Sequence, residues 1–317
     1  MGLDDTIISA SRLWNIDVKR VIKNQPITGS PERCEFRCVV QDVNNDLFVL
    51  ESLIHDDVAH KQTIVRVLNF LSKKGMETVQ PYMPGSGGEY ILGHRGRCWQ
   101  VIPFIDGVSP DRPNYVFDKW RGKPAADFLI QLRAKSAEVP NFTPSHGFSI
   151  KHYIAVLLNR IEAYEPDLFK DVRPIADFLE RGFMGVHDAL PVAFCHGDYH
   201  SLNIIWSKTG INAVIDWEFL GVKPEIYDVA NMIGCIGVEA PESLVHDFVG
   251  DFIFYLKKAG VIAAVSWEYL FEFVLALRFA WLSEWLRHND REMMELETTY
   301  MTILMKNYGN LRDAWAI

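Results

Sequence analysis

The chain has 317 residues, of which 49% are hydrophobic and 23% are charged. This composition is typical of a folded globular protein and excludes disordered, collagen-like and small disulfide-stapled classes. No apolar stretch reaches the roughly 18 to 20 uncharged residues that a membrane-spanning helix needs. The first residues also lack the pattern of a signal peptide. Five scattered cysteines favour a reducing compartment, so a cytoplasmic protein is expected.

The net charge of −9 is unevenly distributed along the chain. Residues 1–105 contain 12 basic and 12 acidic side chains, so the whole acidic excess lies after residue 105. An acidic surface repels nucleic acid and anionic lipid and favours a cationic small molecule. We therefore expect no nucleic-acid partner and no membrane partner.

The first part of the chain has the pattern of a small antiparallel sheet. Residues 35–41 and 47–53 are short β-type runs on either side of a polar turn, which predicts a hairpin. Residues 59–74 carry apolar side chains at helical spacing and stop at a glycine, which predicts one main helix. Residues 90–92 and 99–105 predict two further strands.

The second part, residues 106–317, is predicted to be mostly helical. One exception is 191–216, where short β-type runs alternate with polar turns. The predicted fold class is therefore α+β, with a β-rich part at 1–105 and an α-rich part at 106–317. The helical patterns cover 125–138, 150–164, 173–181, 243–259, 267–288 and 292–306.

The densest cluster of chemically useful residues lies between 195 and 218. A hairpin closed by the two residues Thr209 and Gly210 would place Asn203 directly opposite Asp216. Directly opposed residues have Cβ atoms about 4.5 to 5.5 Å apart and point to the same face. An amide oxygen and a carboxylate at that distance suit a magnesium ion, which takes one or two protein carboxylates together with substrate phosphates.

Four further polar residues belong to this cluster or follow it. Asp198 lies on the loop before Asn203 and is the candidate general base. His196 is expected to orient that loop from beneath, and His200 is grouped with it as a supporting residue. Asp228 precedes a helical segment and is either a helix cap or an anchor for the loop.

These motifs resemble the aminoglycoside phosphotransferase/choline kinase superfamily of protein-kinase-like small-molecule kinases. The resemblance is carried by His196-Gly197-Asp198, by Asn203 five residues later, by Ile215-Asp216-Trp217 and by Tyr227-Asp228-Val229-Ala230. It implies a bilobal protein-kinase-like fold, with 1–105 as the nucleotide-binding lobe and 106–317 as the catalytic and acceptor-binding lobe.

The resemblance also implies an activity. That activity is the transfer of a phosphoryl group from ATP or GTP to the hydroxyl of a small molecule, with Mg²⁺. Asp198 would accept the hydroxyl proton, and Asn203 and Asp216 would hold the metal. The acceptor would be an amino alcohol, an aminoglycoside, a hydroxy amino acid or a sugar.

The sequence departs from the family pattern in the first lobe. The expected glycine-rich loop offers Gly29 and Ser30, the expected strand lysine is Glu51, and the helix 59–74 contains no glutamate. One hypothesis is a reversed ion pair between Glu51 and a cation on the helix. The phosphate contact would then be one of Lys61, Arg66, Arg33 and Arg37. The alternative is a catalytically impaired pseudokinase that senses a nucleotide or metabolite.

Two further sites follow from the resemblance. The segment 99–107 resembles the inter-lobe linker, so backbone groups near Phe104 and Ile105 are expected to meet adenine. Acceptor specificity is expected from Trp217, Glu218, Arg278 and Trp281, because aromatic faces beside acids suit an amine. If Arg278 pairs with the substrate, a hydroxy amino acid such as homoserine is favoured. If it pairs with Glu272 or another internal acid, it is structural.

Overall fold

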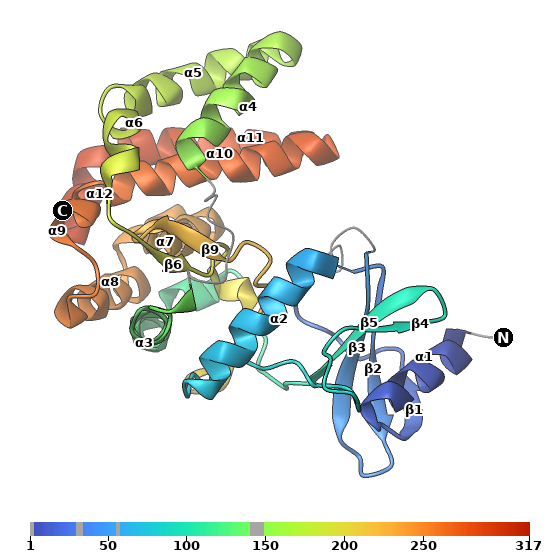
Figure 1. The fold of residues 1–317 in the computed structure, drawn as a ribbon. Coiled ribbons are helices and arrows are strands. Elements are labelled where there is room, and N and C mark those ends of the chain that lie inside the picture. The colour runs from blue at the N-terminus through green and yellow to red at the C-terminus, as the bar shows by residue number, and fades with distance from the viewer. Residues whose placement is uncertain (1–2, 30–33, 55–57, 140–148) are drawn as a thin grey trace. The chain divides into compact units, whose positions relative to one another are not determined.

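The computed structural model describes residues 3–29, 34–54, 58–139 and 149–317. The chain folds into two compact units (Figure 1). One unit contains the described residues of Met1–Ser109 together with Leu202–Phe219, and the other contains the remainder. The chain passes from the second unit to the first after Ser201 and returns after Phe219, so the segment 202–219 lies in the β-rich unit although it is distant from it in sequence. Two predicted nucleotide-binding residues, Ser30 and Arg33, lie outside the described residues.

The first unit is built on a five-stranded antiparallel sheet. Its spatial order is β1 (Val18–Ile22), β2 (Phe36–Asp42), β3 (Leu47–Leu53), β5 (Arg97–Pro103) and β4 (Leu92–His94). The predicted hairpin and the later strand at 99–105 are confirmed, and the strand predicted at 90–92 lies two residues later, at Leu92–His94. Strand β1 was not predicted, because its alternating pattern is short and carries two basic residues.

Two helices accompany the sheet. Helix α2 (Val58–Lys73) matches the predicted helix and buries a stripe of apolar residues at helical spacing. Helix α1 (Leu3–Ser11) was not predicted, since nine residues give little periodicity to read. It packs on one face of the sheet. The shared core there consists of Ile7, Ala10, Trp14, Ile16, Cys38, Val40, Leu50, Trp99 and Val101.

A separate hairpin in the first unit consists of β7 (Ile204–Trp206) and β8 (Ile211–Val214). Ile204 pairs with Val214, and the backbone N–H of Ile215 donates to the Asn203 carbonyl at 2.9 Å. Asn203 therefore lies opposite Ile215, and the predicted register is wrong by one residue. The turn differs from the predicted one, because the Ser207 N–H donates to Gly210 O at 2.8 Å and so closes the hairpin around residues 208 and 209. The register then shifts between Ile205 and Trp206, on the strand before the turn.

The second unit is mostly helical, as predicted. It also contains a two-stranded antiparallel ladder of β6 (Val192–Cys195) and β9 (Gly221–Pro224). Its helices are α3 (Lys119–Lys135), α4 (Ile150–Tyr164), α5 (Pro166–Glu180), α6 (Phe183–Val186), α7 (Tyr227–Glu239), α8 (Asp247–Ala259), α9 (Ala264–Glu268), α10 (Leu270–His288), α11 (Arg291–Lys306) and α12 (Tyr308–Trp315).

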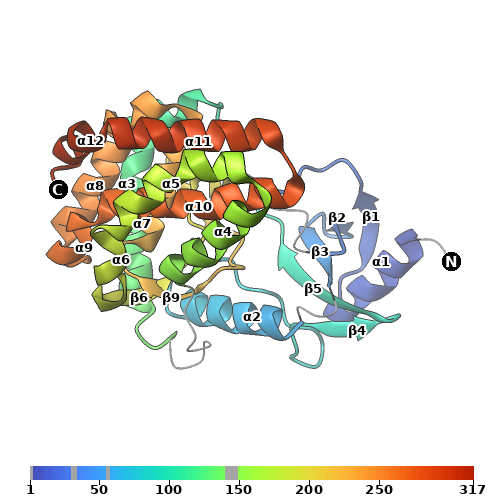
Figure 2. The ribbon, with the colours of Figure 1, turned by 90° about the horizontal axis from the view of Figure 1, so that it is seen from above.

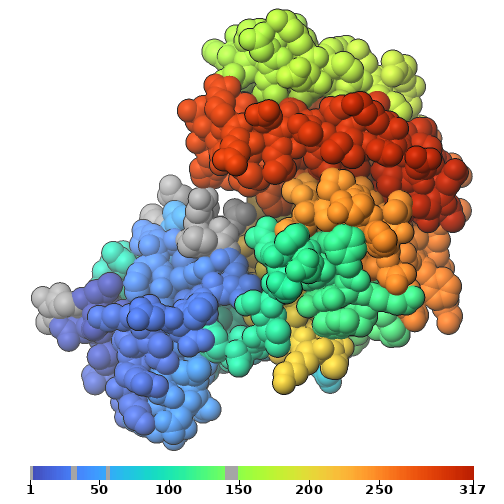
Figure 3. Space-filling view, turned by 180° about the vertical axis from the view of Figure 1, so that it is seen from behind, coloured from blue at the N-terminus to red at the C-terminus, as the bar shows by residue number. Residues whose placement is uncertain are grey.

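Helix α10 is the centre of this unit. Apart from Glu272 and Arg278, its first half is apolar and buried, and it packs against α4, α7 and α11 (Figure 2). The yellow-green surface of α4 and α5 lies against the red surface of the last helices (Figure 3). Among the described helices, none is both long enough and apolar enough to cross a bilayer.

Candidate active site

Asp228 holds the loop that follows β6. Its Oδ2 accepts the backbone N–H of His196 at 2.8 Å, and its Oδ1 accepts that of Gly197 at 2.8 Å. Burial raises the pKa of Asp228, and the two N–H donors oppose that shift. Of the two roles left open by the sequence, the structure shows the loop anchor, because both oxygens reach across to residues 31 and 32 positions earlier.

His196 lies beneath this loop and is fully buried. Its Nδ1 accepts the backbone N–H of Asp198 at 3.2 Å, so this nitrogen carries no proton. Between them, Gly197 has a φ of 87°, which a residue with a Cβ rarely adopts. The histidine and the glycine together set the turn from which Asp198 projects.

Asp198 is partly open to solvent, with 18% of its side chain exposed. Its Oδ2 lies 3.6 Å from His200 Nε2, and its Oδ1 lies 3.4 Å from Asn231 Nδ2. Asn231 was not predicted as a site residue. The available signal was its spacing, because residues three apart on a helix share a face, which places Asn231 beside Asp228 on α7.

An aromatic surface adjoins this carboxylate. The His200 ring lies edge-on to Trp281, with centroids 5.8 Å apart, and Trp281 lies 6.0 Å from Trp285. Both tryptophans come from α10 and are half-buried. The structure thus brings Asp198, His200 and Trp281 together within the second unit.

Asn203 and Asp216 lie in the first unit, at the open end of the β7–β8 hairpin. The Ile215 N–H donates to Asn203 O, so the two side chains leave adjacent backbone positions. Asp216 has a φ of 65°, an uncommon conformation for a residue other than glycine and one that recurs at functional sites.

The donor set at this end of the hairpin fits a hard cation. It combines one amide oxygen with one carboxylate, and Mg²⁺ prefers oxygen ligands. Among the described residues, no three His, Cys, Asp or Glu side chains are grouped closely enough to hold a metal. A cation here would therefore take Asn203, Asp216 and oxygens from a second molecule.

One hypothesis from the sequence paired Glu51 with a cation on the helix, but Lys61 does not make that pair. Its ammonium, on α2, donates to the carboxylate of Glu218, which also lies in the first unit. The Glu218 backbone carbonyl contacts His60 Nε2 at 2.8 Å. Glu218 was predicted to bind the acceptor, and the structure instead places it in an ion pair with α2.

Glu51 is held within the sheet. It lies opposite Gln100 on β5, and Gln100 Nε2 donates to Glu51 Oε2 at 2.6 Å. The Tyr82 hydroxyl lies 3.3 Å from the same amide nitrogen. The predicted reversed pair between Glu51 and α2 is therefore wrong, because the carboxylate already has a neighbour on the adjacent strand.

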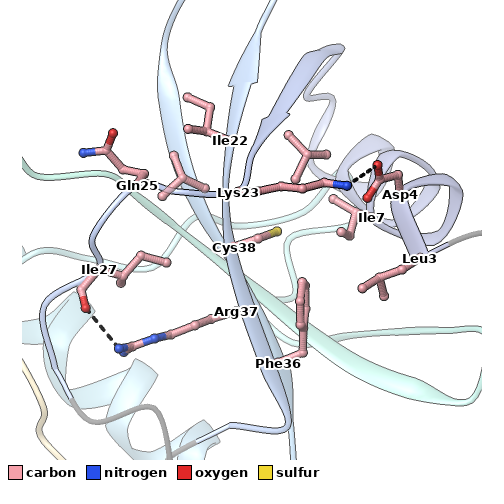
Figure 4. Close-up of a pocket in the computed structure, with 12 residues that line it drawn as sticks. Leu3, Asp4, Ile7, Ile22, Lys23, Gln25, Ile27, Phe36, Arg37 and Cys38 are labelled. Atoms are coloured by element: carbon pink, nitrogen blue, oxygen red, sulfur yellow. Dashed lines mark hydrogen bonds and ion pairs between the residues drawn. The ribbon is translucent and has the colours of Figure 1, made fainter.

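Arg37 and Arg66 occupy different surroundings. Arg37 Nη2 donates to the carbonyls of Ile27 at 3.0 Å and Gly29 at 2.6 Å, and it lines a hollow of about 620 Å³ beside α1 and β1 (Figure 4). It fastens the chain between β1 and β2. Arg66 is exposed and lines a separate hollow with Asn69, Lys73 and Glu89 among others.

The predicted adenine-binding segment follows β5. The Phe104 N–H donates to the Leu47 carbonyl at 2.9 Å, which extends the sheet by one hydrogen bond. The Phe104 N–H is therefore already used within the first unit. Of the two residues named for adenine binding, Ile105 is the one whose backbone stays a prediction.

Two predicted acceptor residues are internal. Arg278 Nε and Nη2 donate to the two carboxylate oxygens of Glu297 at 2.5 and 2.7 Å, and both residues are buried. The second of the two readings of Arg278 therefore holds, with Glu297 as the internal acid. Trp217 is 3% exposed and donates to the Val214 carbonyl at 2.9 Å, so it is a core residue of the first unit.

The sequence of this chain matches a known protein family. The profile of the phosphotransferase enzyme family matches residues 40–259, so the chain belongs to that family. A homoserine kinase from Beijerinckia indica is 26% identical over 167 residues, which cover 52% of this chain and 49% of that protein. The chain therefore matches about half the length of this relative.

Solved structures share the fold. An aminoglycoside phosphotransferase from Alicyclobacillus acidocaldarius superimposes with a TM-score of 0.68 at 11% identity, covering 96% of this chain and 95% of the other. An amicoumacin kinase in complex with AMP-PNP, Ca²⁺ and Ami gives 0.66 at 12% identity, covering 96% and 94%. The predicted protein-kinase-like α+β fold is confirmed.

Proposed function

We propose that the protein is a small-molecule kinase that transfers the γ-phosphoryl group of ATP or GTP to a hydroxyl, with Mg²⁺. One observation carries the proposal. The chain runs from the loop anchored by Asp228, which presents Asp198, directly into the hairpin whose open end presents Asn203 and Asp216. Family membership and the nucleotide analogue in a structural neighbour support the same reading.

The two units would divide the work. The first unit would bind the nucleotide along the sheet and at Ile105, and it would hold the cation with Asn203 and Asp216. When bound, the cation would neutralise phosphate charge. The second unit would bind the acceptor, and Asp198 would accept the proton of its hydroxyl. The hydroxyl oxygen would form its bond to the γ-phosphorus while the bridging P–O bond breaks and the nucleoside diphosphate leaves. His200 and Asn231 would orient that carboxylate.

The acceptor is proposed to carry an amine. Asp198 and the Trp281–Trp285 pair combine a carboxylate with aromatic faces, an arrangement that attracts an ammonium group. The argument from Arg278 for a carboxylate-bearing acceptor falls, because its guanidinium is buried and already donates twice to the Glu297 carboxylate. Hydroxy amino acids nevertheless belong in a substrate screen on the strength of the homoserine kinase similarity.

Thermal unfolding with and without Mg²⁺ and saturating ATP or GTP tests the proposal first. At about 100 times the dissociation constant a ligand adds roughly 2.7 kcal/mol, which raises the midpoint by several degrees. The rise should require Mg²⁺ and should disappear in Asp216→Ala. Nucleotide turnover that depends on an added amino alcohol, aminoglycoside, hydroxy amino acid or sugar would then establish the reaction.

The pseudokinase alternative rests on Glu51, which stands where the family has a lysine and is bonded to Gln100. It predicts nucleotide binding without acceptor-dependent turnover for every acceptor in the screen. A protein that binds neither nucleotide would contradict the kinase and would leave the pseudokinase only as a metabolite sensor.

A further inference from the structure

The first unit contains a largely buried ion pair between Lys61 on α2 and Glu218 on the segment after β8. Lys61 is 4% exposed, and its partner Glu218 is two residues beyond Asp216. Burying an ammonium is costly unless a carboxylate compensates it. The side chain of Lys61 therefore stays in this position because Glu218 holds it there.

Asp216 lies close in the chain to this ion pair. Asp216 and Glu218 are two residues apart on the segment that follows β8, and Glu218 is the partner of Lys61. Because Lys61 bonds directly to Glu218, its ammonium lies in the same part of the first unit as the proposed cation ligand.

The other candidate cations are placed differently. Arg37 is bonded to two loop carbonyls. Arg66 is five residues beyond Lys61 on α2, about 140° around a helix of 3.6 residues per turn, and it is exposed. Arg33 lies outside the described residues. Lys61 alone among the described candidates is buried beside the hairpin end that carries Asp216.

We infer that Lys61 is the residue that binds the nucleotide phosphates, and that it is supplied by helix α2 instead of strand β3. Glu218 acts as its positioning residue. This inference rests on the proposed function and deepens it. A lysine ammonium has three donors, so one can remain on Glu218 while another meets a phosphate oxygen.

The position of Glu51 agrees with this arrangement. A phosphate would be repelled by a bare carboxylate on β3, but Glu51 is turned along the sheet to Gln100, its register partner on β5. The strand acid therefore has its hydrogen-bond partner on β5 and not on α2. The usual pairing of a strand cation with a helix acid is replaced here by a helix cation and an acid from the segment after β8.

The test compares affinities for Mg·ATP and for adenosine, measured by calorimetric titration and competition. Lys61→Met should weaken Mg·ATP binding about 10- to 100-fold, the size expected for a charge-assisted hydrogen bond, and leave adenosine binding unchanged. Glu218→Ala should show the same phosphate-specific loss to a smaller extent. Lys73→Met, which removes an exposed charge from the same helix, is the control and should bind both ligands as wild type does.

A variant that lacks both charges of the Lys61–Glu218 pair separates binding from folding. In Lys61→Met/Glu218→Met no unpaired charge remains, and such replacements are often neutral in stability. The double variant should keep the thermal midpoint of the wild type and still lose Mg·ATP affinity. If the wild type binds Mg·ATP and the double variant binds it equally well, the pair is structural and the inference is overturned. If the wild type binds neither Mg·ATP nor Mg·GTP, the proposed function fails as well.

Discussion

Arg278 and Glu297 form a two-point ion pair inside the second unit, with Nε–Oε1 at 2.5 Å and Nη2–Oε2 at 2.7 Å. The pair joins α10 to α11, and Tyr300 lies within cation–π distance of the guanidinium. Arg278, a charged side chain on the buried face of α10, thereby connects this helix to α11.

Removing one member of this pair should destabilise the protein strongly. Glu297→Ala leaves a buried guanidinium without its carboxylate, and the expected cost is about 3 to 5 kcal/mol. Arg278→Met/Glu297→Met should recover most of that loss in a denaturant titration. A double variant as unstable as Glu297→Ala would contradict this account of the pair.

Two glycines of α7 provide a matched test of packing. A Cβ on Gly237 would overlap the Tyr300 hydroxyl and come within 2.7 Å of Leu244 Cδ2, whereas one on Gly234 would meet its nearest neighbour at 3.6 Å. Gly237→Ala should therefore cost about 1 to 3 kcal/mol. Gly234→Ala should be neutral or slightly stabilising, because alanine favours helix. Equal midpoints for the two variants would argue against this packing.

The carboxylate of Asp228 should make stability depend on pH in an unusual direction. Its pKa is raised in the folded state, mainly by burial, and its neighbours include Arg133 and Lys223. Between the ordinary pKa of 3.8 and the raised value, the folded state holds more protons than the unfolded state. The contribution of this group therefore falls as pH rises through that window and is constant above it.

Asp228→Asn provides the comparison for this effect. The thermal midpoint of the wild type minus that of the variant should decrease from pH 4 toward neutrality and then level off. A difference that grows with pH would mean that the donors from His196 and Gly197 outweigh burial.

Asp198→Asn should abolish most of the proposed phosphoryl transfer while nucleotide binding is retained. Loss of a general base typically lowers kcat about 10²- to 10⁴-fold. The KM for ATP should stay within a few-fold, because Asp198 lies in the unit proposed to bind the acceptor. Asp188→Asn, at an exposed acid, is the control. An unchanged kcat in Asp198→Asn would remove this residue from the chemistry.

Local pattern was enough to predict several elements from the sequence. The β-type run in 47–53 and the apolar spacing in 59–74 and 150–164 each depend on neighbours within the same element, so these segments matched β3, α2 and α4 closely. The order and spacing of His196, Asp198, Asn203 and Asp216 likewise predict the residues of the candidate site from the sequence alone.

What the sequence by itself determined was therefore the type of most long elements, together with the motif residues on which the proposed function rests. The tertiary structure decided the pairings between distant residues: Lys61 with Glu218 across 157 positions, Arg278 with Glu297 on the next helix, and Asn203 with Ile215 instead of Asp216. The physical reason is that a charged side chain pairs with whichever opposite charge the packing brings within reach. That choice depends on how helices and turns meet in space, which no local spacing records.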